Sequence, residues 1–349
     1  MSKRAQSPRI LVMRLDRIGD VVLSTPVVQQ LRAAYPSALI TILVQPACRE
    51  LVEGNPDLDD VLLYDKHRRH RGIFSTIGFA WGLRRYRFDT VLVLHPTNRS
   101  HWIAWFAGIP RRIGYDRKSA WLLTQRLVHR KQEGAKHEAE YALEFLPTMG
   151  CTPTAPQLFV PIRLEAKRRV EAVLREAEMQ PSDRLVVLHP SSSDANRRWS
   201  AERFAQLGDQ LIVSHRVRVI LVGGAEPMHA EAALSVARRM RQPSLNLAGR
   251  LSVGELACVL QRAQALVSND SGPVHIAAAV GTPVVAIFGR NQPGVNAIRW
   301  RPLGEGHVVL ERPDYQASSY IQEISVDEVY EATVRVLERG KAPVPAQRP

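Results

Sequence analysis

Short apolar runs alternate with segments of helical spacing in the first half of the chain. Runs of this length indicate buried strands, and apolar positions three and four residues apart indicate helices. Arg9–Leu15 predicts a first strand, and Val21–Tyr35 predicts one helix that ends before Pro36. Further strands are expected at Leu39–Val44, Val61–Tyr64 and Thr90–Leu94, and helices at Ile73–Arg85 and Ser100–Ala107. This alternation predicts a parallel sheet with crossover helices.

The same alternation begins again after Cys151–Pro161, a proline-rich segment that we interpret as a linker. Strands are expected at Leu185–Leu188, Val217–Val222, Ala265–Ser268 and Val284–Phe288. Helices are expected at Ala201–Val213, Met228–Arg241, Ser252–Gln261, Val274–Val280 and Val326–Arg339. The prediction is an α/β chain with two doubly wound, Rossmann-like domains, 1–160 and 161–325, that face each other across a cleft. A C-terminal helix and flexible tail follow at 326–349.

Composition excludes several classes of protein. The chain has 349 residues, of which 45% are hydrophobic and 23% charged, so disorder is not expected. A spanning helix needs about 18 consecutive apolar residues, and no stretch approaches that length. The apolar run near the N-terminus is too short for a signal peptide. Three widely spaced cysteines give neither a metal pattern nor an even disulfide set, and we expect a cytoplasmic protein.

Positive charge is concentrated in the first half of the chain. The net charge is +13, and residues 1–160 contain 23 Lys and Arg against 14 Asp and Glu. Each basic cluster taken alone is typical of a solvated surface, but several together favour an anionic partner: a phosphorylated glycan, a membrane surface or a nucleic acid. The clusters are Lys66–Arg71, Arg84–Arg87, Arg111–Arg112, Arg117–Lys118 and Arg130–Lys131.

Ligands of doubly wound sheets bind outside the carboxyl ends of the strands, so polar residues there are candidates for chemistry. Asp16–Asp20 follows the first predicted strand, with Gly19 permitting a tight turn. Asp20 is interpreted either as a helix N-cap or as a general base, and Asp16 competes for the second role.

Two candidate segments follow strands of the second domain. His189–Trp199 contains hydroxyls and the pair Arg197 and Arg198, which suit phosphate oxygens, although a polar loop with Trp199 in the core is the alternative. Gly223-Gly224 allows a close approach of the backbone to a ligand or forms a simple turn. The acid that binds sugar hydroxyls would then be Glu226 or Glu231.

A fourth segment, Ser268–His275, runs from a strand into a helix. Pro273 suits the first helical turn, so that the N–H groups of Ser271 and Gly272 would face a diphosphate. The alternative is a capped helix with a packed His275. Asp270 beside a phosphate is costly unless it accepts hydrogen bonds from hydroxyls, which a sugar would supply.

Taken together, these motifs resemble glycosyltransferase family 9, the ADP-heptose:lipopolysaccharide heptosyltransferases. The resemblance rests on ILVMRLDRIGDVVLSTPVVQQLRAAYP near the start, VVLHPSSSDANRRWSAERFAQL at the opening of the second domain, VILVGGAE, and the run from NLAGRLSVGELA to SNDSGPVHIAAAVGTPVVAIFG. The order is that of the family over nearly the whole chain.

The resemblance implies the GT-B fold and inverting, metal-independent transfer of heptose from ADP-heptose to a lipopolysaccharide core, with no cofactor. It implies Asp20 as catalytic base and Arg197, or its neighbour Arg198, as the group that stabilises the departing diphosphate. The implied donor-binding residues are Ser191, Ser192, Glu226 or Glu231, Leu251, Asp270, Ser271, Gly272 and His275. Candidates for the anionic acceptor are Arg17, Arg68, Arg69 and Arg99. We therefore expect peripheral contact with the cytosolic face of the inner membrane.

Other functions stay open at this level. Members of the family use other nucleotide sugars or acceptors, and nothing in the sequence specifies heptose. A basic nucleic-acid-binding protein is a second hypothesis, but the chain shows no nucleic-acid module. A dinucleotide-dependent oxidoreductase is a third, and it is disfavoured because G-x-G-x-x-G does not follow the first strand.

Overall fold

The computed structural model describes residues 7–194, 197–312 and 320–341, and the chain divides into two compact units. Unit 1 spans Met1–Pro161, and unit 2 begins at Ile162. The predicted flexible tail, 342–349, lies outside the described residues. Among the helices described, none is long and apolar enough to cross a membrane.

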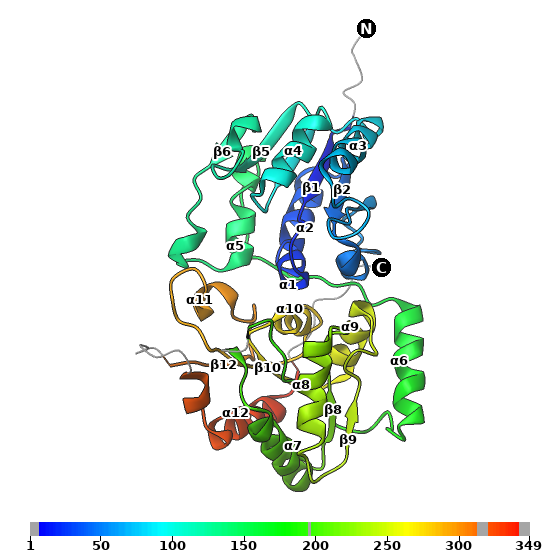
Figure 1. Ribbon diagram of the computed structural model, residues 1–349, viewed down its shortest axis with the longest axis vertical. Helices are drawn as coiled ribbons and strands as arrows, with labels where there is room; N and C mark the ends of the chain where they lie inside the picture. The colour runs from blue at the N-terminus through cyan, green and yellow to red at the C-terminus, as the bar shows by residue number, and fades with distance from the viewer. Residues whose placement is uncertain (1–6, 195–196, 313–319, 342–349) are drawn as a thin grey trace. The chain divides into compact units, whose positions relative to one another are not determined.

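Unit 1 is built on a sheet of six parallel strands in the order β3-β2-β1-β4-β5-β6 (Figure 1). The chain leaves β1 toward β2 on one side and later returns to β4 on the other, so the strand order reverses at β1. The carboxyl ends of β1 and β4 therefore flank the point where such sheets bind ligands. The strands are β1 (Arg9–Met13), β2 (Leu39–Val44), β3 (Asp60–Leu63), β4 (Thr90–Val93), β5 (Arg111–Tyr115) and β6 (Gln125–Leu127).

Helices connect these parallel strands because the chain must return to the same end of the sheet each time. The α-helices of unit 1 are α1 (Ile18–Val22), α2 (Thr25–Ala34), α3 (Ile73–Leu83), α4 (Asn98–Phe106) and α5 (Glu138–Leu143). Short 3₁₀ helices are η1 (Pro46–Leu51), η2 (Arg84–Tyr86), η3 (Ala120–Leu122), η4 (Lys131–Glu133) and η5 (Leu146–Met149).

Unit 2 repeats the same topology, with six parallel strands in the order β12-β11-β10-β7-β8-β9. The strand order reverses between β7 and β10, which pair directly. The strands are β7 (Leu185–His189), β8 (Arg218–Leu221), β9 (Ser244–Asn246), β10 (Ala265–Asn269), β11 (Val284–Ile287) and β12 (Val308–Leu310). The predicted α/β class with two doubly wound sheets is confirmed.

The helices of unit 2 pack on this sheet. The last of them, α12, contributes Val329 and Val336 to the same buried core as Phe204 of α7. The helices are α6 (Leu164–Glu176), α7 (Ala201–His215), α8 (Pro227–Ala237), α9 (Val253–Arg262), α10 (Gly272–Ala279), α11 (Ala297–Trp300), η7 (Tyr320–Glu323) and α12 (Val326–Arg339).

The single helix predicted over Val21–Tyr35 is wrong. The chain forms α1, a break at Leu23 and Ser24, and then α2, whose first turn contains Pro26. Proline has no N–H to donate to the preceding turn and its ring clashes with the carbonyl four residues earlier, so a continuous helix cannot pass through Pro26. Helix α1 therefore ends at Val22.

Several elements were not predicted from the sequence, and β5 shows the reason. Its first residues, Arg111 and Arg112, are polar and were interpreted as a surface cluster. Both side chains are half-buried and donate to main-chain carbonyls, Arg111 to Thr148 and Arg112 to Leu122. This pair is therefore part of the fold of unit 1 and not a free anion-binding cluster.

Candidate functional site

Asp20 lies in the first turn of α1, directly after the carboxyl end of β1. The helix begins at Ile18, and its N-cap residue is Arg17, whose side chain makes no capping bond. The Asp20 carboxylate instead accepts a hydrogen bond from Arg14 Nη2 at 2.6 Å. The N-cap interpretation of Asp20 is therefore wrong, and its carboxylate is one half of an ion pair.

Arg14 is a buried cation surrounded by carboxylates. Its side chain is 2% exposed, and besides Asp20 it contacts Asp16 through Nε at 2.8 Å and Glu138 through Nη2 at 3.0 Å. Burial alone would disfavour the guanidinium charge, but the carboxylates Asp16, Asp20 and Glu138 raise the pKa of Arg14 above its ordinary value. Arg14 therefore stays charged and fixes all three carboxylates at the end of β1.

Lys131 completes this buried cluster. Its ammonium lies 2.6 Å from Glu138 Oε1, and both side chains are almost fully buried. Lys131 Nζ also stands 5.0 Å from the ring centroid of Tyr115, a cation–π contact. The sequence grouped Lys131 with a basic surface cluster, whereas the structure places it inside unit 1 as a partner of Glu138.

Asp16 shares the Arg14 guanidinium with Asp20. Burial raises the pKa of Asp16 to about 7 against the opposing attraction of Arg14, and repulsion from Asp20 adds to the rise. His95, which follows β4, places Nδ1 3.7 Å from Asp16 Oδ2. Burial, followed by the charge of Arg14, lowers the pKa of His95 to about 4, so its ring is neutral at pH 7.

The four arginines predicted to bind an acceptor divide into two groups. Arg17, Arg68 and Arg69 are exposed, and Arg17 immediately precedes α1. Arg99 is half-buried and donates to the carbonyl of Lys66 at 3.3 Å, which ties α4 to the loop after β3. Three of the four are therefore accessible to an anionic ligand, and Arg99 positions the loop that carries Arg68 and Arg69.

In unit 2, Asp270 follows β10 and is held between two arginines. Its Oδ2 lies 3.3 Å from Arg197 Nη1 and 2.7 Å from Arg290 Nη2. Burial, and then the positive charge of Arg290, lower the pKa of Arg197. Asp194, about half exposed, has Oδ2 3.6 Å from Arg197 Nε. The buried part of this cluster contains two guanidinium groups and one carboxylate.

Arg198 occupies a different environment from its neighbour Arg197. Its Nε and Nη2 both donate to the carbonyl of Ser192, at 2.9 and 2.7 Å, and so brace the loop after β7. Trp199 is 1% exposed and its main-chain N–H donates to Asn269 Oδ1 at 3.0 Å. The expectation that Trp199 packs into the core is therefore confirmed, and Arg197 is the arginine whose side chain meets Asp270.

His189, the last residue of β7, is fully surrounded by hydroxyls. Ser191 Oγ lies 2.9 Å from Nε2, while Ser268 Oγ and Ser271 Oγ lie 3.1 and 3.0 Å from Nδ1. Burial, and then the charge of His229, lower the pKa of His189 to about 3. A neutral ring thus joins the loop after β7 to the start of α10.

The start of α10 has the geometry that the sequence predicts. Ser271 is the N-cap, Gly272 is the first helical residue and Pro273 follows in the first turn. Ser271 makes no capping bond with its side chain, so the first N–H groups of the helix lack the partner that a cap usually supplies. His275 is buried, in agreement with the packed alternative.

Packing requires the first glycine of the pair after β8, whereas a Cβ atom on Gly224 would make only ordinary contacts, 3.6 Å from the ring of His229. A Cβ atom on Gly223 would lie 2.8 Å from the carbonyl oxygen of His229, so only glycine fits. Glu226 is the exposed N-cap residue of α8, and Glu231 is exposed one turn later. Leu251, after β9, is half-buried. The structure brings both acids to the same end of the sheet and does not distinguish between them.

Four residues of these two clusters were not predicted as site residues from the sequence: Arg14, Glu138, His189 and Arg290. Arg14 and His189 lie where strands end, and Arg290 follows β11. The rule that ligands bind at the carboxyl ends of strands would have selected these three. Glu138 carries no such signal, because it starts α5 far from β1 in the sequence.

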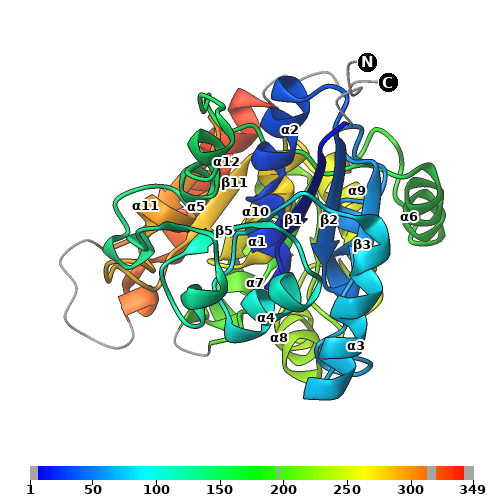
Figure 2. The ribbon, with the colours of Figure 1, turned by 90° about the horizontal axis from the view of Figure 1, so that it is seen from above.

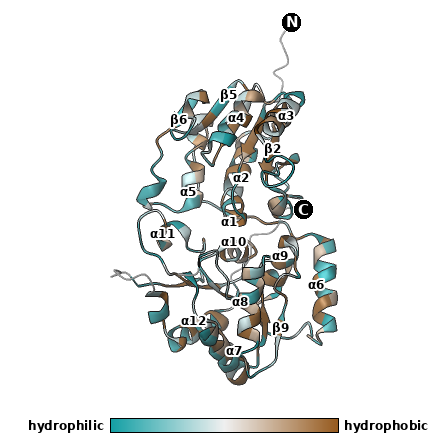
Figure 3. Cartoon of the chain, viewed as in Figure 1, coloured by the Kyte–Doolittle hydropathy of each residue, from teal (hydrophilic) through white to brown (hydrophobic). Residues whose placement is uncertain are grey.

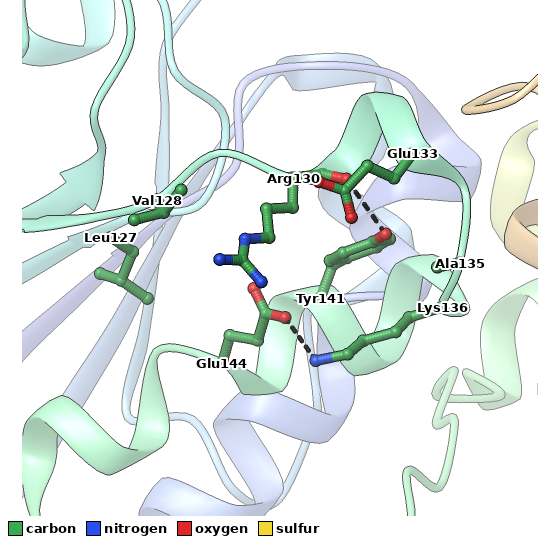
Figure 4. Close-up of a pocket in the computed structure, with 8 residues that line it drawn as sticks. All are labelled: Leu127, Val128, Arg130, Glu133, Ala135, Lys136, Tyr141 and Glu144. Carbon is green, nitrogen blue, oxygen red and sulfur yellow. Dashed lines mark hydrogen bonds and ion pairs between the residues drawn. The ribbon is translucent and has the colours of Figure 1, made fainter.

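A pocket of about 380 Å³ lies on the segment that carries Lys131 and Glu138 (Figure 4). Three of its polar side chains already have partners: Lys136 Nζ lies 2.8 Å from Glu144 Oε1, and Tyr141 donates to the main-chain carbonyl of Arg130. Over the described residues, no group of three or more His, Cys, Asp or Glu side chains has the arrangement of a metal site. The lining residues are Leu127, Val128, Arg130, Glu133, Ala135, Lys136, Tyr141 and Glu144.

Comparison with known proteins gives consistent results for sequence and fold. The family model for glycosyltransferase family 9 (heptosyltransferase) matches residues 78–329. Lipopolysaccharide heptosyltransferase 2 of Escherichia coli (strain K12) is 26% identical over 292 residues, covering 82% of this chain and 84% of that protein. Lipooligosaccharide heptosyltransferase 2 of Haemophilus influenzae is 28% identical over 298 residues, covering 81% and 84%.

Solved structures agree with the architecture. A glycosyl transferase family 9 protein from Veillonella parvula superimposes with a TM-score of 0.88 at 26% identity, covering 97% of this chain and 100% of that one. The E. coli ADP-heptose LPS heptosyltransferase II superimposes with a TM-score of 0.79 at 23% identity, covering 95% and 99%.

Proposed function

We propose a reaction from one premise: the chain belongs to glycosyltransferase family 9 and is a glycosyltransferase. The proposed reaction transfers a heptose from ADP-heptose to a lipopolysaccharide core, with inversion at the anomeric carbon and without a metal ion. The names of the two related heptosyltransferases support the sugar and the acceptor class. Another nucleotide sugar or glycan acceptor is the alternative.

In the proposed mechanism Asp20 is the general base. An acceptor hydroxyl oxygen attacks the anomeric carbon, the bond from that carbon to the diphosphate oxygen breaks, and the hydroxyl proton passes to the Asp20 carboxylate. The ion pair with Arg14 supports this role, because it holds the Asp20 carboxylate in a fixed position after the end of β1. Asp16 is the alternative base, since a carboxyl whose pKa lies near 7 is matched to proton transfer at neutral pH.

Unit 2 supplies the proposed donor site. The leaving ADP gains negative charge as the sugar bond breaks, and Arg197 would stabilise that charge, together with N–H groups at the start of α10. Ser191 and Ser192 stand in the same loop, while Asp270 would accept hydrogen bonds from sugar hydroxyls. Arg197 and Arg290 flank Asp270, and their forked guanidinium groups suit the oxygens of a diphosphate.

The acceptor is proposed to bind unit 1. Arg17, Arg68 and Arg69 are exposed on the unit that carries the proposed base, and an acidic lipid-linked glycan matches their charge. Such an acceptor would bring the protein to the cytosolic face of the inner membrane. Higher salt is then expected to raise the apparent KM for acceptor more than that for donor.

The Arg14–Asp20 ion pair at the switch point of the first sheet is the observation that carries this proposal. The test incubates the purified protein with ADP-heptose and truncated lipopolysaccharides and detects the gain of one heptose by mass spectrometry. Asp20→Asn is expected to lower the rate by about 10²–10⁴-fold, the usual contribution of a general base. Asp60→Asn, an exposed aspartate of the same unit, is the matched control.

Each component of the proposal has its own contradicting result. A larger loss in Asp16→Asn than in Asp20→Asn would transfer the base role to Asp16. Transfer from UDP- or GDP-sugars but not from ADP-heptose would reject the donor. Full activity of Asp20→Asn would reject the mechanism while leaving family membership untouched.

A further inference from the structure

Unit 1 exposes a group of large aromatic side chains that we call the aromatic patch: Phe74, Trp81, Trp102, Trp105 and Trp121. Phe74 is 89% exposed, Trp121 69% and Trp81 58%. Four of the six tryptophans of the chain belong to it. Single exposed apolar residues are ordinary, but a gathering of this size marks an interaction surface.

Helix α3 contributes two members on one face. Phe74 and Trp81 are seven residues apart, so both project from the same side of the helix. The opposite side is buried through Thr76, Ala80 and Leu83. Apolar residues on both sides of α3 are unusual for a helix that faces water, and Figure 3 shows brown segments along this helix.

Contacts join α3 to the other elements of the patch. Helices α3 and α4 pack together and lie side by side in Figures 1 and 2. Arg84 Nε, just after α3, donates to the carbonyl of Phe106 at 3.0 Å, and the ring of Phe106 meets Trp105 with centroids 4.8 Å apart. Trp102 Nε1 donates to Ser119 Oγ at 3.3 Å, next to η3.

Positive charge surrounds the aromatic patch. Residues 66–121 expose eight Lys and Arg side chains, and this stretch contains only two acidic residues, Asp89 and Asp116. The Arg84 guanidinium lies 5.1 Å from the ring centroid of Trp81, so charge and aromatic surface are in direct contact. Arg85 and Lys118 are exposed close to α3 and η3 in the sequence.

We propose that the aromatic patch and its basic surround bind the surface of an anionic lipid bilayer. Tryptophan is enriched at the interface of membranes, where its ring reaches the headgroup level, and each nearby Lys or Arg adds attraction to anionic lipids. The excess of cations selects a bilayer over a second copy of this basic chain, because two such surfaces would repel each other. The inference deepens the proposed function, which supplies a lipid-linked acceptor, by naming the face of unit 1 that meets the membrane.

The test measures cosedimentation of the full chain with vesicles of phosphatidylcholine containing 30% phosphatidylglycerol, without donor or acceptor. The wild-type protein is expected to bind these vesicles, and to bind pure phosphatidylcholine at least about tenfold more weakly. Phe74→Ser/Trp121→Ser is expected to lower the partition coefficient on anionic vesicles about tenfold, because it removes two interfacial anchors.

The matched control is Leu164→Ser/Val213→Ser, which removes two similarly exposed apolar side chains from unit 2. This variant is expected to bind as the wild type does. Circular dichroism verifies the fold of each variant, and the single variants Phe74→Ser and Trp121→Ser provide a second measurement with partial losses.

Three results would overturn the inference: equal binding by the aromatic double variant and wild type, equal binding to neutral and anionic vesicles, or a dimer in lipid-free solution that the aromatic double variant dissociates. The last result would assign the aromatic patch to contact between copies of this chain. Because vesicle binding requires no sugar transfer, a failed transferase assay leaves this result intact, and the reverse also holds.

Discussion

Arg14 Nη2 lies 2.6 Å from Asp20 Oδ1. This contact joins the residue that directly follows β1 to the first turn of α1. The same nitrogen is 3.0 Å from Glu138 Oε1, so one buried group links a carboxylate at the site to a carboxylate inside unit 1. A proposed base is thereby tied to the core by a rigid, charged contact. Disturbing Arg14 should affect both the stability of unit 1 and the position of the Asp20 carboxylate.

Replacing Arg14 by methionine is expected to lower the free energy of unfolding by about 3–5 kcal/mol, because it leaves buried carboxylates without their cation. Urea denaturation followed by circular dichroism measures this loss. Arg14→Lys retains the charge but not the forked geometry, so it should fold better than Arg14→Met and still lose activity.

The positioning role of Arg14 has a signature that simple destabilisation does not produce. Arg14 lowers the pKa of Asp16 against the effect of burial, so without this cation Asp16 should titrate at higher pH and the acidic limb of the kcat profile should move with it. An unchanged pH profile in folded Arg14→Met, with the charge-retaining Arg14→Lys as its control, would restrict Arg14 to a structural role.

Asp16 is expected to make stability depend on pH in a defined direction. Its pKa is about 7 in the folded protein against an ordinary value of 3.8, so the folded state binds its proton more tightly than the unfolded chain does. The stabilisation from this proton is complete below about pH 4 and is lost as pH rises to about 7.

Asp16→Asn mimics the protonated side chain and isolates this effect. The free energy of unfolding of Asp16→Asn relative to wild type should rise between pH 4 and pH 7 and stay level above that. Urea titrations at four pH values measure this difference in the free energy of unfolding. Asp60 is exposed, so the difference between Asp60→Asn and wild type should be the same at every pH. A constant difference for Asp16→Asn would contradict the raised pKa.

Strong local patterns were sufficient to predict much of the fold. The apolar run of β2 gives Leu39–Val44, and the spacing of α12 gives Val326–Arg339, with bounds identical to those observed. Both are long, regular segments whose periodicity reflects one buried face. At β5 the pattern failed, because Arg111 and Arg112 satisfy their guanidinium groups on main-chain carbonyls inside the unit.

The candidate site shows a different limit of sequence reasoning. Asp20 and Asp270 were predicted because each follows a strand, and strand ends are visible in the sequence. The partner Glu138 lies 124 residues from Arg14. No local spacing connects such residues, since only the folding of the sheet brings them together. The buried ion pair of Lys131 could not be predicted either, because its neighbour Arg130 is basic and exposed.

Arg197 and Arg198 are adjacent in the sequence but are expected to differ in catalysis. Arg197→Met removes the guanidinium that contacts Asp270, and we expect a fall in kcat of about 10²–10³-fold, the usual effect of removing one donor to a developing negative charge. Arg198→Met is the matched control, because the Arg198 guanidinium is already occupied by the carbonyl of Ser192.

Measurements of nucleotide binding distinguish the loss of a contact with the diphosphate from a general disturbance of the loop after β7. ADP should raise the Tm of the wild type more than UDP, GDP or NAD, and Arg197→Met should lose most of that shift. Arg197→Lys restores a positive charge without the forked donors, so it should recover part of the ADP shift. If Arg198→Met loses more kcat and more ADP stabilisation than Arg197→Met while its fold is intact, the role of holding the diphosphate belongs to Arg198. Stabilisation by NAD alone would contradict an ADP-sugar donor altogether.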